Sequence, residues 1–173
     1  MDIIKILSKE MENEAATTRK MLARIPEDKY DWQPHPKSMT IRRLATHIAD
    51  IGSWVQMAVC DDELDFATST HREPEINDNT ALLDFFEKSY SAGKAALDNA
   101  ILEELEKPWT MRNGEQVYFT QSKFEVIRAS FCQIVHHRAQ LGVYLRLLDV
   151  AIPGSYGPSA DEMEMQSETE PAL

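Results

Sequence analysis

The stretch that decides the fold is residues 122–148, SKFEVIRASFCQIVHHRAQLGVYLRLL, in which apolar side chains recur every three or four positions. This spacing places them on one face of an α-helix, because an α-helix completes a turn in about 3.6 residues. We therefore predict a long amphipathic helix from about Ser122 to Leu148. Its apolar face consists of Phe124, Ile127, Phe131, Ile134, Leu141, Tyr144, Leu145 and Leu148.

The same spacing predicts three further helices. They cover residues 4–25, about 41–60, and 82–97, with a continuation or restart through 101–105. Pro26 and Pro108 end the first and third helices, and Ser38 or Thr40 caps the second, since a side-chain hydroxyl accepts the N–H groups of a first turn. Four amphipathic helices predict an all-α four-helix bundle, and the long polar link 61–79 permits a crossover connection.

Two segments depart from the helical pattern. Asn113-Gly114 lies between β-forming residues in the stretch 109–119, which predicts a short β-hairpin just before the last helix. Residues 159–173 carry five acidic side chains and no basic one, so we expect an acidic, disordered tail after a bundle domain of residues 1–158.

Composition excludes several classes of function. The chain has 173 residues and a net charge of −11, from 18 basic and 29 acidic side chains, which argues against binding to nucleic acid or anionic lipid. No apolar run approaches the roughly 20 residues of a membrane span, and the N-terminus lacks the apolar core of a signal peptide. Only Cys60 and Cys132 are present, so we expect free thiols and a cytoplasmic location.

Two histidines fall on the predicted interior faces of different helices. His47 lies between Leu44 and Ile51, and His137 lies between Ile134 and Leu141, whereas His136 turns toward a flank. Burying imidazoles is costly unless their nitrogens find partners. The pair therefore predicts either a hydrogen-bonded polar cluster or a site for a divalent cation.

Two more polar residues accompany this pair. Gln133 lies one turn before His137 and could either complete a three-ligand set or hydrogen-bond the ring. Asp50, one turn after His47, could orient a ligating imidazole. We find no phosphate-binding glycine loop, nucleophile elbow or zinc-protease motif.

Several of these motifs together resemble a known family. They are Pro34-His-Pro-Lys-Ser-Met-Thr, His47-Ile-Ala, His136-His-Arg-Ala-Gln-Leu-Gly-Val-Tyr-Leu-Arg and Pro153-Gly-Ser-Tyr-Gly-Pro. To about residue 162 the chain resembles the DinB-like superfamily of bacterial metal-binding bundles. The resemblance implies up-down-down-up helix order, a homodimer, and a divalent metal held by three histidines, one on the second helix and two spaced by four on the last.

The resemblance assigns metal ligands residue by residue. His47 and His137 match two of the family's histidines, and Gln133 stands where the usual pattern has the third. Because an amide oxygen is a weaker ligand than imidazole for zinc or nickel, we expect weak metal binding. The resemblance identifies no catalytic residue beyond these ligands.

The relatives of this family imply an activity. They include bacillithiol S-transferases and mycothiol-dependent maleylpyruvate isomerase, which implies a transferase or isomerase that uses a low-molecular-weight thiol against a small electrophile. Two alternatives remain open. One is a non-enzymatic or degenerate dimeric bundle without a catalytic metal, and the other is a small-ligand-binding stress-response module.

Overall fold

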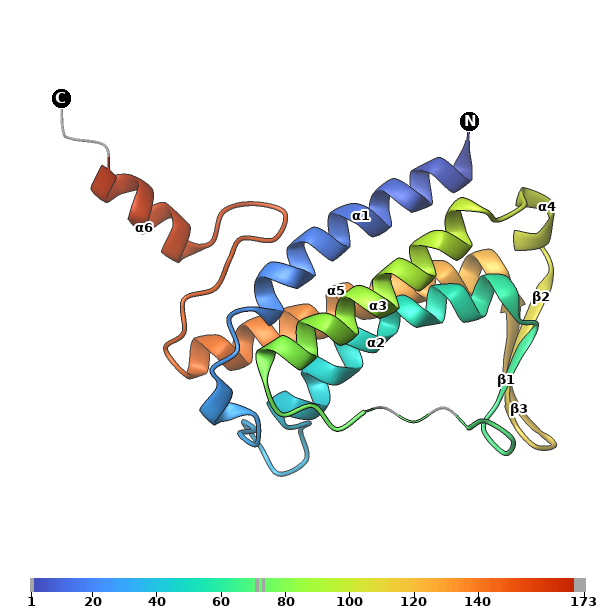
Figure 1. The fold of residues 1–173 in the computed structure, drawn as a ribbon, viewed down its shortest axis with the longest axis horizontal. Coiled ribbons are helices and arrows are strands. Elements are labelled where there is room, and N and C mark those ends of the chain that lie inside the picture. Colours follow the sequence, from blue (N-terminus) through green and yellow to red (C-terminus); the bar gives the residue numbers. More distant parts are fainter. Residues whose placement is uncertain (1, 71, 73, 170–173) are drawn as a thin grey trace.

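Four long helices and a small sheet make up the fold (Figure 1). The computed structural model describes residues 2–70, 72 and 74–169, with side chains up to residue 165. The long helices are α1 (Ile3–Leu22), α2 (Ile41–Cys60), α3 (Asn79–Asp98) and α5 (Lys123–Leu147). The shorter ones are a 3-10 turn (Glu27–Lys29), α4 (Leu102–Leu105) and α6 (Ala160–Thr169). The strands are β1 (Glu63–Asp65), β2 (Pro108–Asn113) and β3 (Gln116–Ser122).

The long helices begin where side-chain caps predict. Thr40, one of the two expected caps, accepts the backbone N–H of Arg43 at the start of α2. At the start of α5, the Ser122 hydroxyl accepts the Glu125 N–H at 3.2 Å, and the Glu125 carboxylate accepts the Ser122 N–H at 2.8 Å. This reciprocal pair satisfies donors that the first helical turn leaves without partners. The predicted bounds of α2 and α5 are therefore confirmed to within about a residue.

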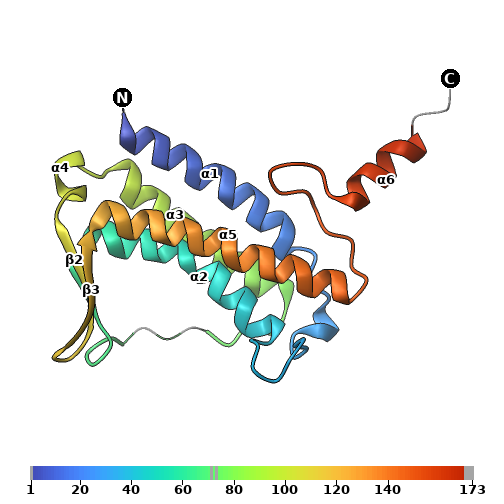
Figure 2. The ribbon, with the colours of Figure 1, turned by 180° about the vertical axis from the view of Figure 1, so that it is seen from behind.

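Helix α2 is the centre of the bundle and packs against both α3 and α5. Its buried face accounts for this position, because every turn contributes an apolar side chain to the core. The chain that follows β1 leads away from the sheet, and α3 begins at the opposite end of the bundle (Figures 1 and 2). The fully buried apolar side chains of α2 include Ile41, Leu44, Ile48, Ile51 and Val55.

Two glycines set the distance between α2 and α3. A Cβ atom on Gly93 would lie 2.2 Å from the backbone oxygen of Gly52, which is far inside van der Waals contact. Beside this crossing, the Ser89 hydroxyl accepts the Ser53 N–H at 2.7 Å and donates to the Asp50 carbonyl at 2.9 Å. Gly93, a weak helix former in the middle of α3, is thus explained by the close approach of two backbones.

The sheet contains the expected hairpin and one unexpected strand. β2 and β3 pair antiparallel, with Gly114 and Glu115 between them, so the turn lies one residue later than Asn113-Gly114 predicts. Gly114 has a φ of 59°, which favours glycine. β1 pairs in parallel with β2, and Glu63 forms an ion pair with Arg112 at 2.7 Å. The expectation of an all-α chain with a hairpin alone is therefore corrected to a mostly helical chain with a three-stranded sheet.

A buried ion pair attaches the segment after α5 to the bundle. The Arg138 side chain is 2% exposed and lies 2.6 Å from a carboxylate oxygen of Glu14. The Tyr156 hydroxyl accepts from Arg138 at 3.1 Å and donates to Glu14 at 2.8 Å. These contacts bind the turn at residues 153–158 to α1 and α5.

The last described element is α6, which projects beyond the bundle in both ribbon views (Figure 2). Asp161 pairs with Arg146, and Glu162 accepts the Gly154 N–H at 2.9 Å. The division into residues 1–158 and 159–173 stays a prediction, and residues 170–173 lie outside the described residues.

Two further expectations concern the whole chain. In the described part of the chain, no helix is long and apolar enough to cross a bilayer. Cys60 and Cys132 are free thiols, as expected, and both side chains are exposed.

Candidate functional site

The two histidines predicted to converge do so at the seam between α2 and α5. The ring centroids of His47 and His137 lie 4.7 Å apart, with the ring planes at 79°. Buried neighbours orient them, because Ile48 on α2 and Ile134 and Leu141 on α5 are all in the core. Both histidines are only half-buried, so a ligand can reach the pair from solvent.

A glutamine one turn further along α5 holds the His137 ring. The Nδ1 atom of His137 lies 2.8 Å from Oε1 of Gln140. An amide oxygen only accepts hydrogen bonds, so Nδ1 carries the proton and the lone pair of the neutral ring is on Nε2. Burial lowers the pKa of His137, as do the neighbouring His47 and His136, against the opposing effect of Gln140. The neutral imidazole is thus the favoured form near pH 7.

Gln133 does not join the two rings. It is exposed on α5, and in the described part of the chain no hydrogen bond connects it to either histidine. No group of three His, Cys, Asp or Glu side chains among the described residues is arranged to hold a metal ion. Of the three predicted ligands, the structure shows the rings of His47 and His137 side by side.

The other histidines take different positions. His136 is exposed, yet its ring centroid lies 4.9 Å from that of His137. The geometry of a straight helix predicts that it turns aside, so its proximity reflects the side-chain rotamer. His35 accepts the Lys37 N–H in the turn before α2, and His71 lies outside the described residues.

Asp50 holds the side chain of Trp54, which packs against His47. Its carboxylate is buried and accepts hydrogen bonds from the Trp54 indole N–H and the Ser53 hydroxyl, both at 3.1 Å. The Trp54 ring in turn packs edge-on against His47, with centroids 5.2 Å apart. Asp50 therefore positions the aromatic neighbour of a candidate ligand.

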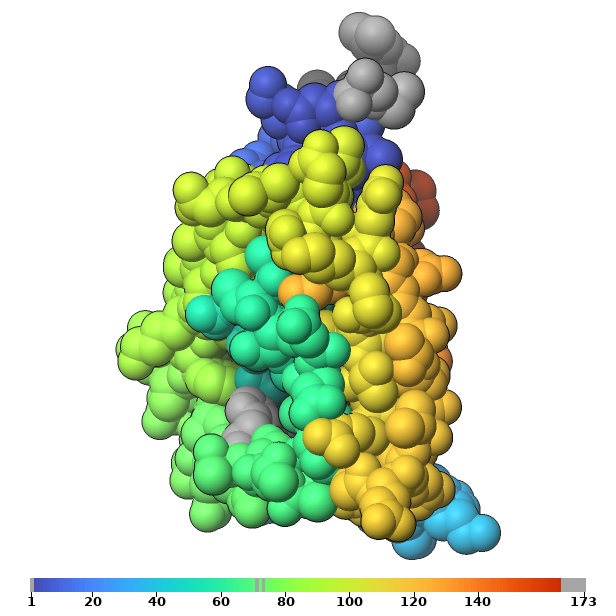
Figure 3. Space-filling model, turned by 90° about the vertical axis from the view of Figure 1, so that its right-hand side faces the viewer, coloured from blue at the N-terminus to red at the C-terminus, as the bar shows by residue number. Residues whose placement is uncertain are grey.

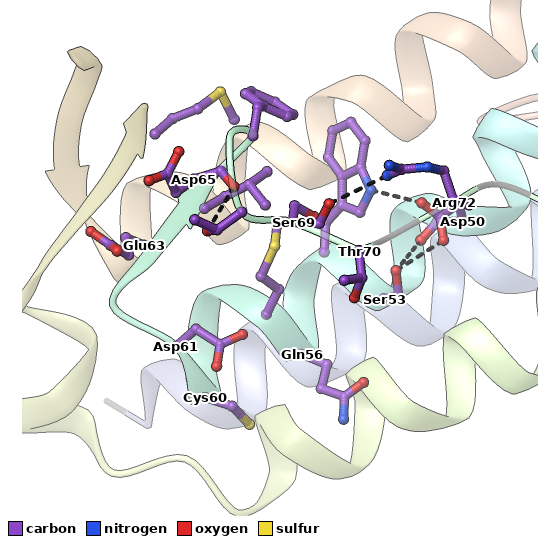
Figure 4. A pocket seen from close by; sticks show the side chains of 16 residues that line it. Asp50, Ser53, Gln56, Cys60, Asp61, Glu63, Asp65, Ser69, Thr70 and Arg72 are labelled. Carbon is purple, nitrogen blue, oxygen red and sulfur yellow. Dashed lines mark hydrogen bonds between the residues drawn. The ribbon is translucent and has the colours of Figure 1, made fainter. Parts of the chain in front are cut away.

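A cavity of about 930 Å³ is lined in part by Trp54. Asp50, Ser53 and Gln56 line it from α2, and Ser69 and Thr70 line it from the segment after β1 (Figure 4). Figure 3 views this end of the molecule, where the surface is hollowed beside the green segment that follows α2. The link 61–79 thus supplies one wall of the cavity.

Sequence reasoning missed this cavity and the role of Gln140. The cavity depends on β1, a strand too short to show alternation. Gln140 carries a usable signal, because a side chain three positions after a helical histidine lies on the same face.

The donor atoms at the seam partly fit a divalent metal. Two imidazole nitrogens suit zinc or nickel, whereas the amide of Gln133 is exposed and would be the weaker donor. This set suits weak binding better than a closed structural site.

Comparisons with known proteins agree with this fold. The model of the DinB family matches residues 4–171. Two similar solved structures are DinB-like proteins. The one from Bacillus subtilis has a TM-score of 0.67 and 15% identity over 86% of this chain and 96% of that chain. The one from Bacillus cereus ATCC 10987 has a TM-score of 0.67 and 21% identity over 87% of this chain and 95% of that chain.

A third similar structure is an enzyme. It is a mycothiol-dependent maleylpyruvate isomerase, with a TM-score of 0.60 and 13% identity over 80% of this chain and 60% of that chain. No curated protein matches the chain. Identities this low establish a shared fold and nothing about activity. The family model matches nearly the whole length of the chain, and the chain therefore belongs to the DinB family.

Proposed function

We propose that this protein binds a divalent metal, zinc or nickel, through His47 and His137, with Gln133 as a weak third ligand. In this proposal it uses the metal to activate a low-molecular-weight thiol for an S-transfer or isomerisation reaction. The observation that carries the proposal is the 4.7 Å approach of two imidazoles from different helices. The fold shared with a mycothiol-dependent isomerase supports the thiol part.

The chain's own residues prepare the site for a cation. Gln140 fixes the His137 tautomer, so that the Nε2 lone pair remains available, and the lowered pKa of His137 keeps the ring neutral near pH 7. Asp50 and Trp54 restrict the His47 ring from the other side. A bound metal with open positions supplies stabilisation of a thiolate at neutral pH.

One observation favours a second candidate. Gln133 is exposed and makes no hydrogen bond to either ring in the described part of the chain. A degenerate bundle, whose His47 and His137 form a polar cluster without a catalytic metal, is therefore the alternative. A non-catalytic small-ligand-binding protein would use the same fold.

The proposal includes the family's assembly and helix order. Neighbouring exposed apolar side chains near the end of α5 support a homodimer, since Val143 is 59% and Leu147 60% exposed. The start of α3 at the end of the bundle opposite the sheet supports up-down-down-up order. Light scattering at micromolar concentration should give twice the mass of one chain, and the mass of a single chain would contradict the dimer.

Calorimetry with zinc and nickel on protein purified without an affinity tag tests the metal site. We expect weak binding to the natural protein, none to His137→Ala, unchanged binding to His136→Ala, and tighter binding to Gln133→His. Binding to Gln133→His alone would establish the degenerate alternative. If neither protein binds, the proposed convergence on one ion is wrong.

A further inference from the structure

We infer that the cavity beside α2 is a binding site for an organic cation with an apolar or aromatic body. Its volume of about 930 Å³ falls within the range of pockets that enclose small organic ligands. The inference does not rest on the proposed metal site, because neither histidine of the pair lines the cavity.

The apolar part of the lining suits a flat or bulky organic group. Trp54 and Phe66 contribute aromatic rings, and Met57 and Met111 contribute thioethers, which adapt to irregular shapes. The Trp54 indole N–H donates to the Asp50 carboxylate at 3.1 Å. This bond draws electron density into the indole ring and strengthens its attraction for a cation lying over its face.

The charged part of the lining is mainly acidic. Among the described residues that line it, four carboxylates face one guanidinium, that of Arg72, which donates to the Ser69 carbonyl. Arg112 compensates two of the carboxylates, Glu63 at 2.7 Å and Asp65 at 3.4 Å. The four carboxylates are Asp50, Asp61, Glu63 and Asp65.

Asp61 is the carboxylate best placed to meet a ligand. It is exposed at the C-terminal end of α2, and its side chain forms no ion pair with any described residue. Asp50, by contrast, is 3% exposed and is engaged with Trp54 and Ser53. Asp61 therefore supplies the negative charge that a cation entering the cavity would reach.

The end of helix α2 is a separate source of negative potential. Cys60 and Asp61 line the cavity where this 20-residue helix ends, and the C-terminus of a helix carries partial negative charge. The nearby ammonium of Lys123 is occupied, because it lies 3.2 Å from the Val59 carbonyl and 2.9 Å from Asp62. The C-terminal end of α2 and the carboxylates that line the cavity together favour a cationic ligand and disfavour an anionic one.

The test uses three small probes of similar size: benzyltrimethylammonium, uncharged benzyl alcohol and anionic phenylacetate. Binding is followed by NMR through the indole N–H resonance of Trp54, which is assigned with Trp54→Phe. We expect benzyltrimethylammonium to shift this resonance and to bind more tightly than the other two probes. Added salt should weaken binding of the cation and leave that of benzyl alcohol unchanged.

Two matched variants locate the charge that matters. Asp61→Asn should weaken binding of benzyltrimethylammonium by about five- to tenfold and leave benzyl alcohol binding unchanged. Asp84→Asn removes an exposed carboxylate from α3, outside the cavity, and should change neither. Circular dichroism and thermal melting confirm that both variants are folded.

Three results would overturn the inference. The first is an unmoved Trp54 resonance at millimolar benzyltrimethylammonium. The second is binding of phenylacetate as tight as that of the cation. The third is an equal loss of affinity in Asp61→Asn and Asp84→Asn, which would reduce the effect to the net charge of the protein.

Discussion

Replacing Gly93 with alanine should destabilise the bundle, because the added methyl group has no space at the α2–α3 crossing. Its Cβ would lie 2.2 Å from the Gly52 backbone oxygen and 2.7 Å from the terminal methyl of Met11. The methionine can rotate away, but the carbonyl moves only if the helices separate. The clash therefore requires a shift of α2, the helix that carries His47.

The expected magnitude follows from two opposing effects. The higher helix propensity of alanine by itself stabilises a helix interior by about 1 kcal/mol relative to glycine. Overpacking a core costs about 1–3 kcal/mol, and a backbone neighbour places this site at or above the upper end. We therefore expect a net loss of about 2 kcal/mol in the free energy of unfolding. For a chain of this length that corresponds to a melting temperature lower by about 4–8 °C.

Thermal and urea unfolding of three alanine variants measure this effect. Gly157→Ala is the control, because its Cβ would meet no heavy atom within 4 Å, and it should change stability by less than about 0.5 kcal/mol. Gly52→Ala, with backbone atoms of Ser89 and Tyr90 at 2.9 Å, should also destabilise. A Gly93→Ala protein that melts at or above the wild-type temperature would refute the backbone contact between α2 and α3.

Three further predictions concern pH, the loop after α5 and the C-terminus. The pKa of His137 is lowered from 6.5 in the folded protein, so the unfolded chain binds its proton more tightly. The free energy of unfolding should therefore fall as pH drops below about 6.5, and urea titrations should show a smaller fall in His137→Gln. Tyr156→Phe should cost about 1 kcal/mol in thermal melts through loss of the hydroxyl between Arg138 and Glu14, whereas Tyr118→Phe should not. A chain ending at Pro158 should lose less than about 1 kcal/mol, because Arg146 in the Arg146–Asp161 pair is half-exposed to solvent, and a loss of several kcal/mol would place α6 in the folding unit.

The helices could be predicted because their apolar residues repeat with the helical period over many turns. Thr40 then marks the start of α2 by local chemistry alone, and the ends of α2 agree with the expected residues. Pro26 marks the end of α1 less well, because that helix ends at Leu22 and not at the expected Ile25. β1 could not be predicted in this way. It has three residues, Glu63–Asp65, and the strand it pairs with lies 47 positions away in sequence, at Thr110–Arg112. Pairing at that distance depends on how the helices fold, which no local pattern records.

The candidate site, too, could be predicted only in part from the sequence. His47 and His137 could be placed together because helix faces are readable from spacing, and the 4.7 Å approach bears this out. Side-chain rotamers are not readable from spacing. They decide that the His136 ring lies near His137 and that Gln133, on the expected face, makes no hydrogen bond to either ring of the pair in the described structure. The metal ligation of this set stays a prediction.

The short parallel strand β1 has a consequence for how the protein opens. Only three residues pair with β2, so this segment has few hydrogen bonds and should open locally at a much lower free energy than the long helices. Amide hydrogens of residues 63–65 should therefore exchange with solvent well before those in the middle of α2. Because β1 leads directly into one wall of the cavity, a small molecule could enter or leave on the timescale of this local opening, while the bundle remains folded.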